Sequence, residues 1–193
     1  MSGISGSIAA AAAYFHASLW APPPRVLHLH LSGATDKIAD SLTEEKGVVE
    51  KIFPMMKSYV CSTLKIDETL LRASGPVDII HLAGHGETIT VKGVPIAVAR
   101  LQPKLVVLNA CNSVSLARDI CNQVPTIVVT SWRDDVASAD CIDWTRQLYN
   151  QIKTPPSNWA VAAREAKSLR GQRAGGDLVV IDGGGVRCDC AMG

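Results

Sequence analysis

Aromatic side chains are scarce in this sequence: Phe, Trp and Tyr together make up 5% of the 193 residues. Hydrophobic residues nevertheless reach 47%, so the core must be built mainly from Val, Ile, Leu and Ala. Such a composition is typical of strands that are covered by helices on both faces. Because the length favours one compact domain, we expect a single α/β domain.

An excess of charge of either sign is also missing. The 19 Lys and Arg residues are balanced by 18 Asp and Glu residues, which leaves a formal net charge of +1. A broad nucleic-acid-binding surface needs a clustered excess of Lys and Arg, and a disordered chain or an acidic tail needs a high net charge. Nucleic acid is therefore not an expected partner.

The apolar segment 4–20 lacks the basic region that precedes the apolar part of a signal peptide. It also lacks a leucine-rich centre, and His16 and Ser18 interrupt it. We interpret residues 1–24 as an Ala-rich N-terminal helix followed by a Pro-rich connector, with a targeting segment as the alternative. This interpretation predicts no membrane partner.

The six cysteines do not show the regular spacing of a disulfide framework. No secretory signal precedes them, which favours a reducing, cytoplasmic location. Cys188 and Cys190 lie in the segment 183–193, which we expect to be a flexible tail. His28 and His30 share one face of a predicted strand, but no Cys or carboxylate at ligand spacing accompanies them. We therefore expect no bound metal and no organic cofactor.

Hydrophobic periodicity divides the chain between residues 25 and 182, which we take as one domain, into strands and helices. The predicted strands are 25–31, 62–66, 77–83, 105–110, 126–130 and 177–181, with a short β-excursion at 88–91. The predicted helices are 36–59, which Gly47 or Pro54 could divide, 95–101, 114–121, 135–152 and a last helix with Ser157 as its N-cap. Alternation of this kind predicts a mostly parallel central sheet with helices on both faces.

Two reactive side chains follow neighbouring predicted strands. His85 comes after the strand that ends at Ala83, and Cys111 comes after the strand that ends at Ala110. Reacting groups of open α/β sheets collect beyond the carboxyl ends of the strands, so both side chains are expected at one rim. A histidine can accept the proton of a cysteine thiol and later protonate a leaving amine. This pair is the minimum that acyl transfer requires.

The glycines beside His85 add a second expectation. Gly86 leaves its backbone amide unobstructed, so its N–H could stabilise an oxyanion together with the N–H of Cys111. The alternative is structural, because a cysteine after an apolar strand is often a small buried residue and a histidine beside glycine is often a turn residue. His81, inside a buried strand, is expected to hydrogen-bond a neighbour rather than react.

Two segments, VDIIHLAGHG at 77–86 and PKLVVLNACNS at 103–113, together resemble the paired signature of the CHAT family. This family comprises caspase-like peptidases of the caspase, separase and gingipain clan, and the resemblance covers about residues 25–182. It implies a three-layer caspase-like fold with His85 as general base and acid, Cys111 as nucleophile and Gly86 as an oxyanion donor.

The expected substrate-binding residues are Asn109, Asp134 and Asp135. Asn109 precedes the cysteine motif and is neutral, whereas Asp134 and Asp135 follow the next strand, whose end should border the same rim. Asp140 is a more distant option. A carboxylate in the pocket would select Arg or Lys in the substrate. The alternative is that Asp134 and Asp135 cap the helix that starts nearby, in which case the pocket favours an uncharged side chain.

These observations together predict a cytoplasmic cysteine endopeptidase that cleaves a protein substrate through a thioester on Cys111. The alternative is a catalytically inactive caspase-fold module that binds or regulates a partner at the same rim. The family domain is commonly attached to helical repeats or other modules, so we also consider an activating protein partner or an oligomer. The stripe of Arg164, Lys167, Arg170 and Arg173 is expected to be a solvated helix face.

Overall fold

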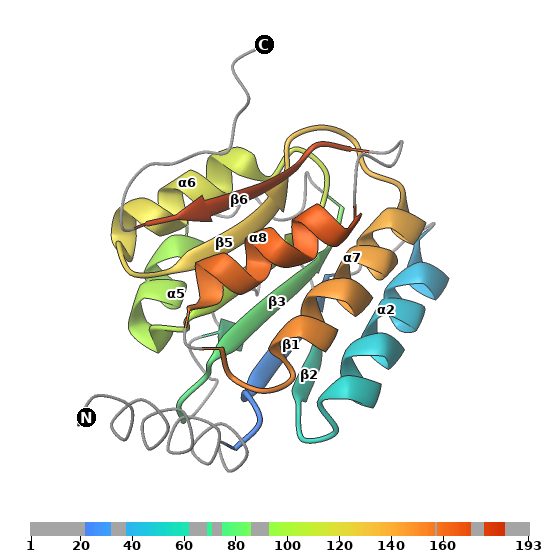
Figure 1. The fold of residues 1–193 in the computed structure, drawn as a ribbon, viewed down its shortest axis with the longest axis horizontal. Helices are drawn as coiled ribbons and strands as arrows, with labels where there is room; N and C mark the ends of the chain where they lie inside the picture. The colour runs from blue at the N-terminus through green and yellow to red at the C-terminus, as the bar shows by residue number, and fades with distance from the viewer. Residues whose placement is uncertain are drawn as a thin grey trace, which may run out of the picture.

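The computed structural model describes residues 22–31, 38–61, 69–70, 75–85, 93–156, 158–170 and 176–183. These ranges contain six strands and five helices (Figure 1). In chain order they are β1 (Val26–Leu31), α2 (Ala39–Ile52), β2 (Lys57–Cys61), β3 (Ile79–Gly84), α5 (Val94–Leu101), β4 (Leu105–Asn109), α6 (Val114–Gln123), β5 (Val128–Trp132), α7 (Ser138–Ile152), α8 (Trp159–Arg170) and β6 (Leu178–Asp182). The expected α/β class is confirmed.

The six strands form one sheet in the order β2-β1-β3-β4-β5-β6. β1 to β5 are parallel, and β6 pairs with β5 in the antiparallel direction. The chain moves from β1 outward to the edge strand β2 and then returns past β1 to β3. In open α/β sheets such a reversal creates a crevice at the carboxyl ends of the strands. The topology therefore points to this rim as the place for a site.

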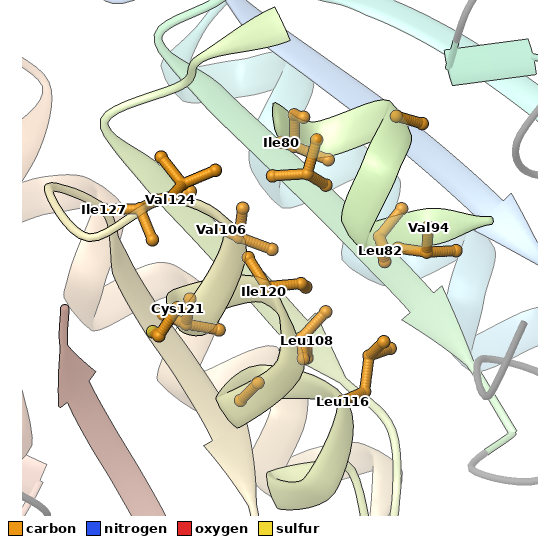
Figure 2. Packing of buried hydrophobic residues seen from close by; sticks show 14 of the residues in the cluster. Ile80, Leu82, Val94, Val106, Leu108, Leu116, Ile120, Cys121, Val124 and Ile127 are labelled. Atoms are coloured by element: carbon orange, nitrogen blue, oxygen red, sulfur yellow. The ribbon is translucent and has the colours of Figure 1, made fainter. Parts of the chain in front are cut away.

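Helices cover both faces of the sheet and give it three layers (Figure 1). On one face, α5 and α6 pack against alternate strand residues such as Ile80, Leu82 and Leu108 (Figure 2). On the other face, α2, α7 and α8 pack against residues such as Ile79 and Val107. Because both faces are buried, the central strands are continuous apolar runs rather than alternating ones.

Simple sequence features explain why α5 and α6 form. In α6 the buried residues are Leu116, Ala117, Ile120 and Cys121, whose spacing places them on one side of a helix. α5 has Pro95 in its first turn, where the missing N–H of proline costs no helical hydrogen bond. Both helices were expected at these places, and α6 runs two residues further than predicted.

Other boundaries differ from the expectation. α2 ends at Ile52, because Pro54 cannot continue a helix, and Gly47 stays inside it. The prediction of a helix to residue 59 is therefore wrong, since the chain already enters strand β2 at Lys57. The predicted strand 62–66 and the β-excursion at 88–91 lie outside the described residues. α7 begins at Ser138 rather than at residue 135.

Arg170 does not belong to a solvated face, which corrects the interpretation of the basic stripe. Its side chain is buried, donates a hydrogen bond to Asp140 Oδ1 at 3.0 Å and lies 4.9 Å from the centre of the Trp132 ring. Arg170 thus connects the end of α8 to the first turn of α7. Arg164 pairs at 3.7 Å with Asp182, and position 173 is outside the described residues.

The two ends of the chain fall largely outside the described residues. This holds for the expected N-terminal helix and for both cysteines of the tail, and the cap expected at Ser157, inside the chain, also lies outside the described residues. Gly183 is described, and its N–H donates to the Ile127 carbonyl at 3.0 Å. A Cβ at this position would come within 2.6 Å of the Pro125 carbonyl oxygen, so this close approach requires glycine. The described fold thus extends one residue into the expected tail.

Candidate active site

The ends of β3 and β4 bring His85 and Cys111 to one rim of the sheet. β3 and β4 are parallel neighbours, with Ala83 paired to Asn109, so the residues that follow them leave the sheet side by side. This adjacency was expected from the spacing of the two motifs and is confirmed. His85 is exposed, whereas Cys111 is half-buried.

Both side chains line a single pocket of about 140 Å³ above the strand ends. One wall is the start of α2, the floor is formed by the ends of β3 and β4, and the other wall is the segment that leads into α7. The lining residues from these three parts are Ile38, Ser41, Leu42 and Glu45; Gly84, His85, Asn109, Ala110 and Cys111; and Val136, Ser138 and Cys141.

The Cys111 sulfur is held by the backbone that precedes α7. The Val136 N–H donates to Sγ at 3.3 Å, and the Val136 carbonyl oxygen lies 3.8 Å from the same sulfur as an acceptor for the thiol. Val136 lies just before Ala137, the N-cap of α7. The two contacts therefore hold the sulfur against the backbone that leads into α7.

The turn that carries Cys111 is attached to the loop after β5. Asn112, whose φ of 54° lies in the left-handed region that asparagine tolerates, donates from Nδ2 to Asp135 Oδ1 at 3.0 Å. The Ser113 N–H donates to the Trp132 carbonyl at 2.9 Å, and the Trp132 N–H donates back to Ser113 Oγ at 3.1 Å. These bonds fix the position of Cys111 relative to the loop that provides Val136.

A buried polar cluster lies directly beneath the pocket. Glu45 Oε1 accepts hydrogen bonds from His81 Nε2 at 2.9 Å, from Thr145 Oγ1 at 2.8 Å and from Asn109 Nδ2. His81 Nδ1 lies 2.6 Å from the Tyr149 hydroxyl. The cluster joins α2, β3, β4 and α7, and it confirms that His81 hydrogen-bonds its neighbours.

The charges of this cluster follow from burial and hydrogen bonding. Burial would raise the pKa of Glu45, but attraction to His81 and the bonds donated by His81, Asn109 and Thr145 outweigh it and hold the pKa below its usual value. The Glu45 carboxyl is therefore ionised at neutral pH. Burial and the charge of Glu45 raise the pKa of the Tyr149 hydroxyl well above its usual value, so this hydroxyl stays protonated.

Glu45, Thr145 and Tyr149 were not anticipated as part of the site. A signal for Glu45 exists in the sequence, because it follows Leu42 by three residues and precedes Val49 by four, and these three are the buried residues of α2. A carboxylate on the apolar stripe of a helix needs partners. Those partners come from positions 36 to 100 residues away, and no local pattern identifies them.

The expected substrate-binding residues have different surroundings. Asn109 lines the pocket, but it is buried, its Nδ2 donates within the cluster and its Oδ1 accepts from Trp132 Nε1 at 3.2 Å. Asp134 and Asp135 are exposed in the loop after β5 and do not line this pocket. The alternative that they cap α7 is wrong, because the N-cap is Ala137. Gly86 lies outside the described residues.

Other potential sites were considered in the described part of the chain. His28 and His30 do share a face, but no group of three His, Cys, Asp or Glu side chains there is arranged to hold a metal ion. The His28 ring instead lies 4.9 Å from the His81 ring, with Nδ1 at 3.2 Å from Ser58 Oγ. Among the described helices, none combines the length and apolar character needed to cross a bilayer.

Comparison of the chain with protein-family models and with curated proteins finds no match. The resemblance to the CHAT family therefore depends on the two motifs at 77–86 and 103–113.

Proposed function

We propose that this chain is a caspase-like cysteine peptidase in which Cys111 is the nucleophile and His85 is the general base and acid. The observation that carries the proposal is the shared pocket: a cysteine and a histidine from the ends of adjacent parallel strands line one small cavity. A backbone N–H that donates to the sulfur at 3.3 Å adds to it. The resemblance of the segments 77–86 and 103–113, which contain the two residues, to the CHAT signature also supports the proposal.

In the first step His85 accepts the thiol proton, and Cys111 Sγ attacks the carbonyl carbon of the scissile peptide bond. A carbon–sulfur bond forms, and the negative charge moves to the carbonyl oxygen. The N–H of Cys111 is one candidate donor to this oxyanion, and the N–H of Gly86 is the second. The buried bonds of Asn109 hold the strand end that presents Cys111, which reduces the reorganisation that the attack requires.

In the second step the carbon–nitrogen bond breaks, and His85 returns its proton to the departing amine. The acyl group remains on Cys111 as a thioester. Water then attacks the thioester carbon while His85 accepts a proton from it. The carbon–sulfur bond breaks, and His85 returns the proton to Cys111 Sγ, so the products are a carboxylic acid and the free thiol. This sequence uses protein groups and water, and it needs neither metal nor organic cofactor.

A reducing cytoplasm fits this chemistry, because the thiol must stay reduced to act. Cys111, Cys121 and Cys141 are free thiols. The proposal therefore includes a cytoplasmic location and a protein substrate. It also includes activation of the peptidase by a protein partner or by formation of an oligomer.

The test is selective alkylation followed by a cleavage assay. Brief treatment of the folded protein with iodoacetamide, read by peptide mass spectrometry, is expected to modify Cys111 before Cys121, which is buried on the opposite face. With a library of unstructured peptides, Cys111→Ala and His85→Ala are each expected to lose at least about a thousandfold in kcat/KM, and the double variant no more. Cys121→Ala is the matched control and keeps its activity.

Three other outcomes would contradict parts of the proposal. A folded protein in which Cys111 resists alkylation and no peptide is cleaved favours the inactive interaction module. A His85→Ala variant with nearly full turnover overturns the assignment of the base. Alkylation of Cys141 before Cys111 would also count against the proposal, because burial raises the pKa of the Cys141 thiol and Cys141 is therefore expected to be the less reactive of the two.

A further inference from the structure

The buried carboxylate beneath the pocket uses only one of its two oxygens inside the protein. All three hydrogen bonds to Glu45 converge on Oε1. Oε2 receives none from the described residues, and it is not among the fully enclosed polar atoms that lack a partner. Glu45 is 2% exposed and lines the pocket that contains Cys111. Oε2 therefore keeps some exposure, and the pocket of Cys111 is a cavity that the Glu45 side chain lines.

A free oxygen on a buried, ionised carboxylate is costly unless a donor reaches it. Among the described residues that line the pocket there is no Lys or Arg, and Glu45 is the one carboxylate. The described lining of the pocket therefore provides no Lys or Arg side chain to Oε2. The ligand that best satisfies the site carries a positive charge and several N–H donors.

The walls of the pocket define the shape of this ligand. Ile38 and Leu42 offer apolar surface, while Ser41 and Ser138 offer hydroxyl acceptors. A volume of about 140 Å³ is well below the roughly 300 Å³ of the smallest pockets for whole drug-sized ligands. It suits one side chain with an apolar stem and a polar end.

We propose that this pocket binds the ammonium group of a substrate lysine, with Glu45 Oε2 as the charged acceptor and Ser41 and Ser138 as neutral ones. Arginine fits less well, because a guanidinium gains most from a bidentate pair with both carboxylate oxygens, and Oε1 is already occupied. An ammonium is a compact charge with three donors, and one oxygen with two hydroxyls matches it. This inference rests on the proposed function, since it assigns the substrate class of the same site, and it replaces Asp134 and Asp135 as the expected selecting carboxylates.

The first test uses the unmodified protein, so that folding of a variant cannot confuse the result. Nα-acetyl-lysine methylamide at a few millimolar is expected to slow alkylation of Cys111 by iodoacetamide by at least tenfold. Nα-acetyl-norleucine methylamide, which keeps the stem and lacks the charge, is expected to slow it less than twofold, and the arginine analogue is expected to lie between them. Equal protection by the lysine and norleucine compounds overturns the proposal.

The second test replaces Glu45 with its amide. Glu45→Gln keeps the shape and can keep the bonds to Oε1, but it places an NH₂ group at the position of Oε2. Protection by the lysine compound, taken as the ratio of the alkylation rates with and without the compound in the same variant, is expected to disappear. Glu44→Gln, an exposed neighbour on α2, is the matched control and keeps the protection.

The two proposals can fail separately. If Cys111 is alkylated readily and peptides are cleaved with no preference for lysine, the pocket assignment fails and the peptidase stands. If no peptide is cleaved but the lysine compound binds to the Cys111→Ala protein in an NMR titration, while the norleucine compound does not, the peptidase fails. In that case the lysine site stands as a recognition site.

Discussion

Acid pH is expected to destabilise the fold through His28, one of three buried histidines among the described residues. His28 is fully buried on β1, and its Nε2 has no hydrogen-bond partner in the described structure. Burial, with smaller contributions from His81, His30 and Lys46, lowers the pKa of His28 from 6.5 to about 2. The ring therefore stays neutral in the native state over the whole range in which the unfolded chain becomes protonated.

The sign of the effect follows from proton binding. Below pH 6.5 the unfolded state binds a proton at His28 that the native state does not bind, so the free energy of unfolding falls as the pH falls. The limiting slope for one such group is about 1.4 kcal/mol per pH unit. Because the unfolded ring is only partly protonated near pH 6.5, the loss between pH 7 and pH 5 amounts to about 2 kcal/mol. Glu45, with its lowered pKa, adds to the loss only as the pH falls below 4.5.

Urea unfolding at pH 7, 6 and 5 measures this effect. His28→Leu removes the titrating ring and is expected to flatten the curve of unfolding free energy against pH by about 2 kcal/mol between pH 7 and pH 5. Ser58→Ala removes the hydroxyl at 3.2 Å from His28 Nδ1 and leaves the ring in place, so it is expected to keep the wild-type slope. Parallel curves for the wild type and His28→Leu would refute the reasoning.

Substitution of Gly47 and of Gly183 by alanine should change the stability in opposite directions. Gly183→Ala is expected to cost about 1–3 kcal/mol in urea unfolding, because its Cβ would collide with the Pro125 carbonyl. Gly47→Ala is expected to stabilise α2 by about 0.5–1 kcal/mol, because a Cβ there meets no atom within 4 Å, and a change of the same sign at both positions would contradict these environments. Arg170→Met is expected to lower the free energy of unfolding by about 2–3 kcal/mol, because it leaves the carboxylate of Asp140 without its partner. The double variant with Asp140→Asn is expected to recover part of this stability in the same assay. No recovery in the double variant would contradict a stabilising ion pair.

The parts of the fold that local pattern controls were predictable. β3 and β4 are short apolar runs with glycine, proline or a polar turn at their ends, and such runs leave few alternatives to a buried parallel strand. Once the two strands are neighbours, His85 and Cys111 meet at the rim because side chains that follow parallel strands leave on the same edge. Prediction of the candidate dyad therefore required only the order of the strands and helices and the chemistry of cysteine and histidine.

The parts that depend on contacts between distant segments were not predictable. Asp134 and Asp135 follow a strand that ends at the correct rim, yet the loop turns both side chains outward, and Asp135 accepts its bond from Asn112. Arg170 has the spacing of a solvated residue, but its charge is neutralised by Asp140, which is 30 residues away. In both cases the backbone path between elements determines the environment, and residue type alone does not describe that path.

Glu45 shows how such a contradiction can itself point to a site. A helix with Leu42 and Val49 on its buried face gains stability when the position between them is apolar, and a carboxylate there requires its own set of donors. The fold supplies His81, Asn109 and Thr145 for one oxygen, and it leaves the second oxygen of this pocket-lining side chain without a hydrogen bond from the described residues. A purely structural carboxylate is best stabilised when both oxygens are satisfied inside the protein. The unequal use of its two oxygens is therefore the reason to assign Glu45 a role in binding the substrate.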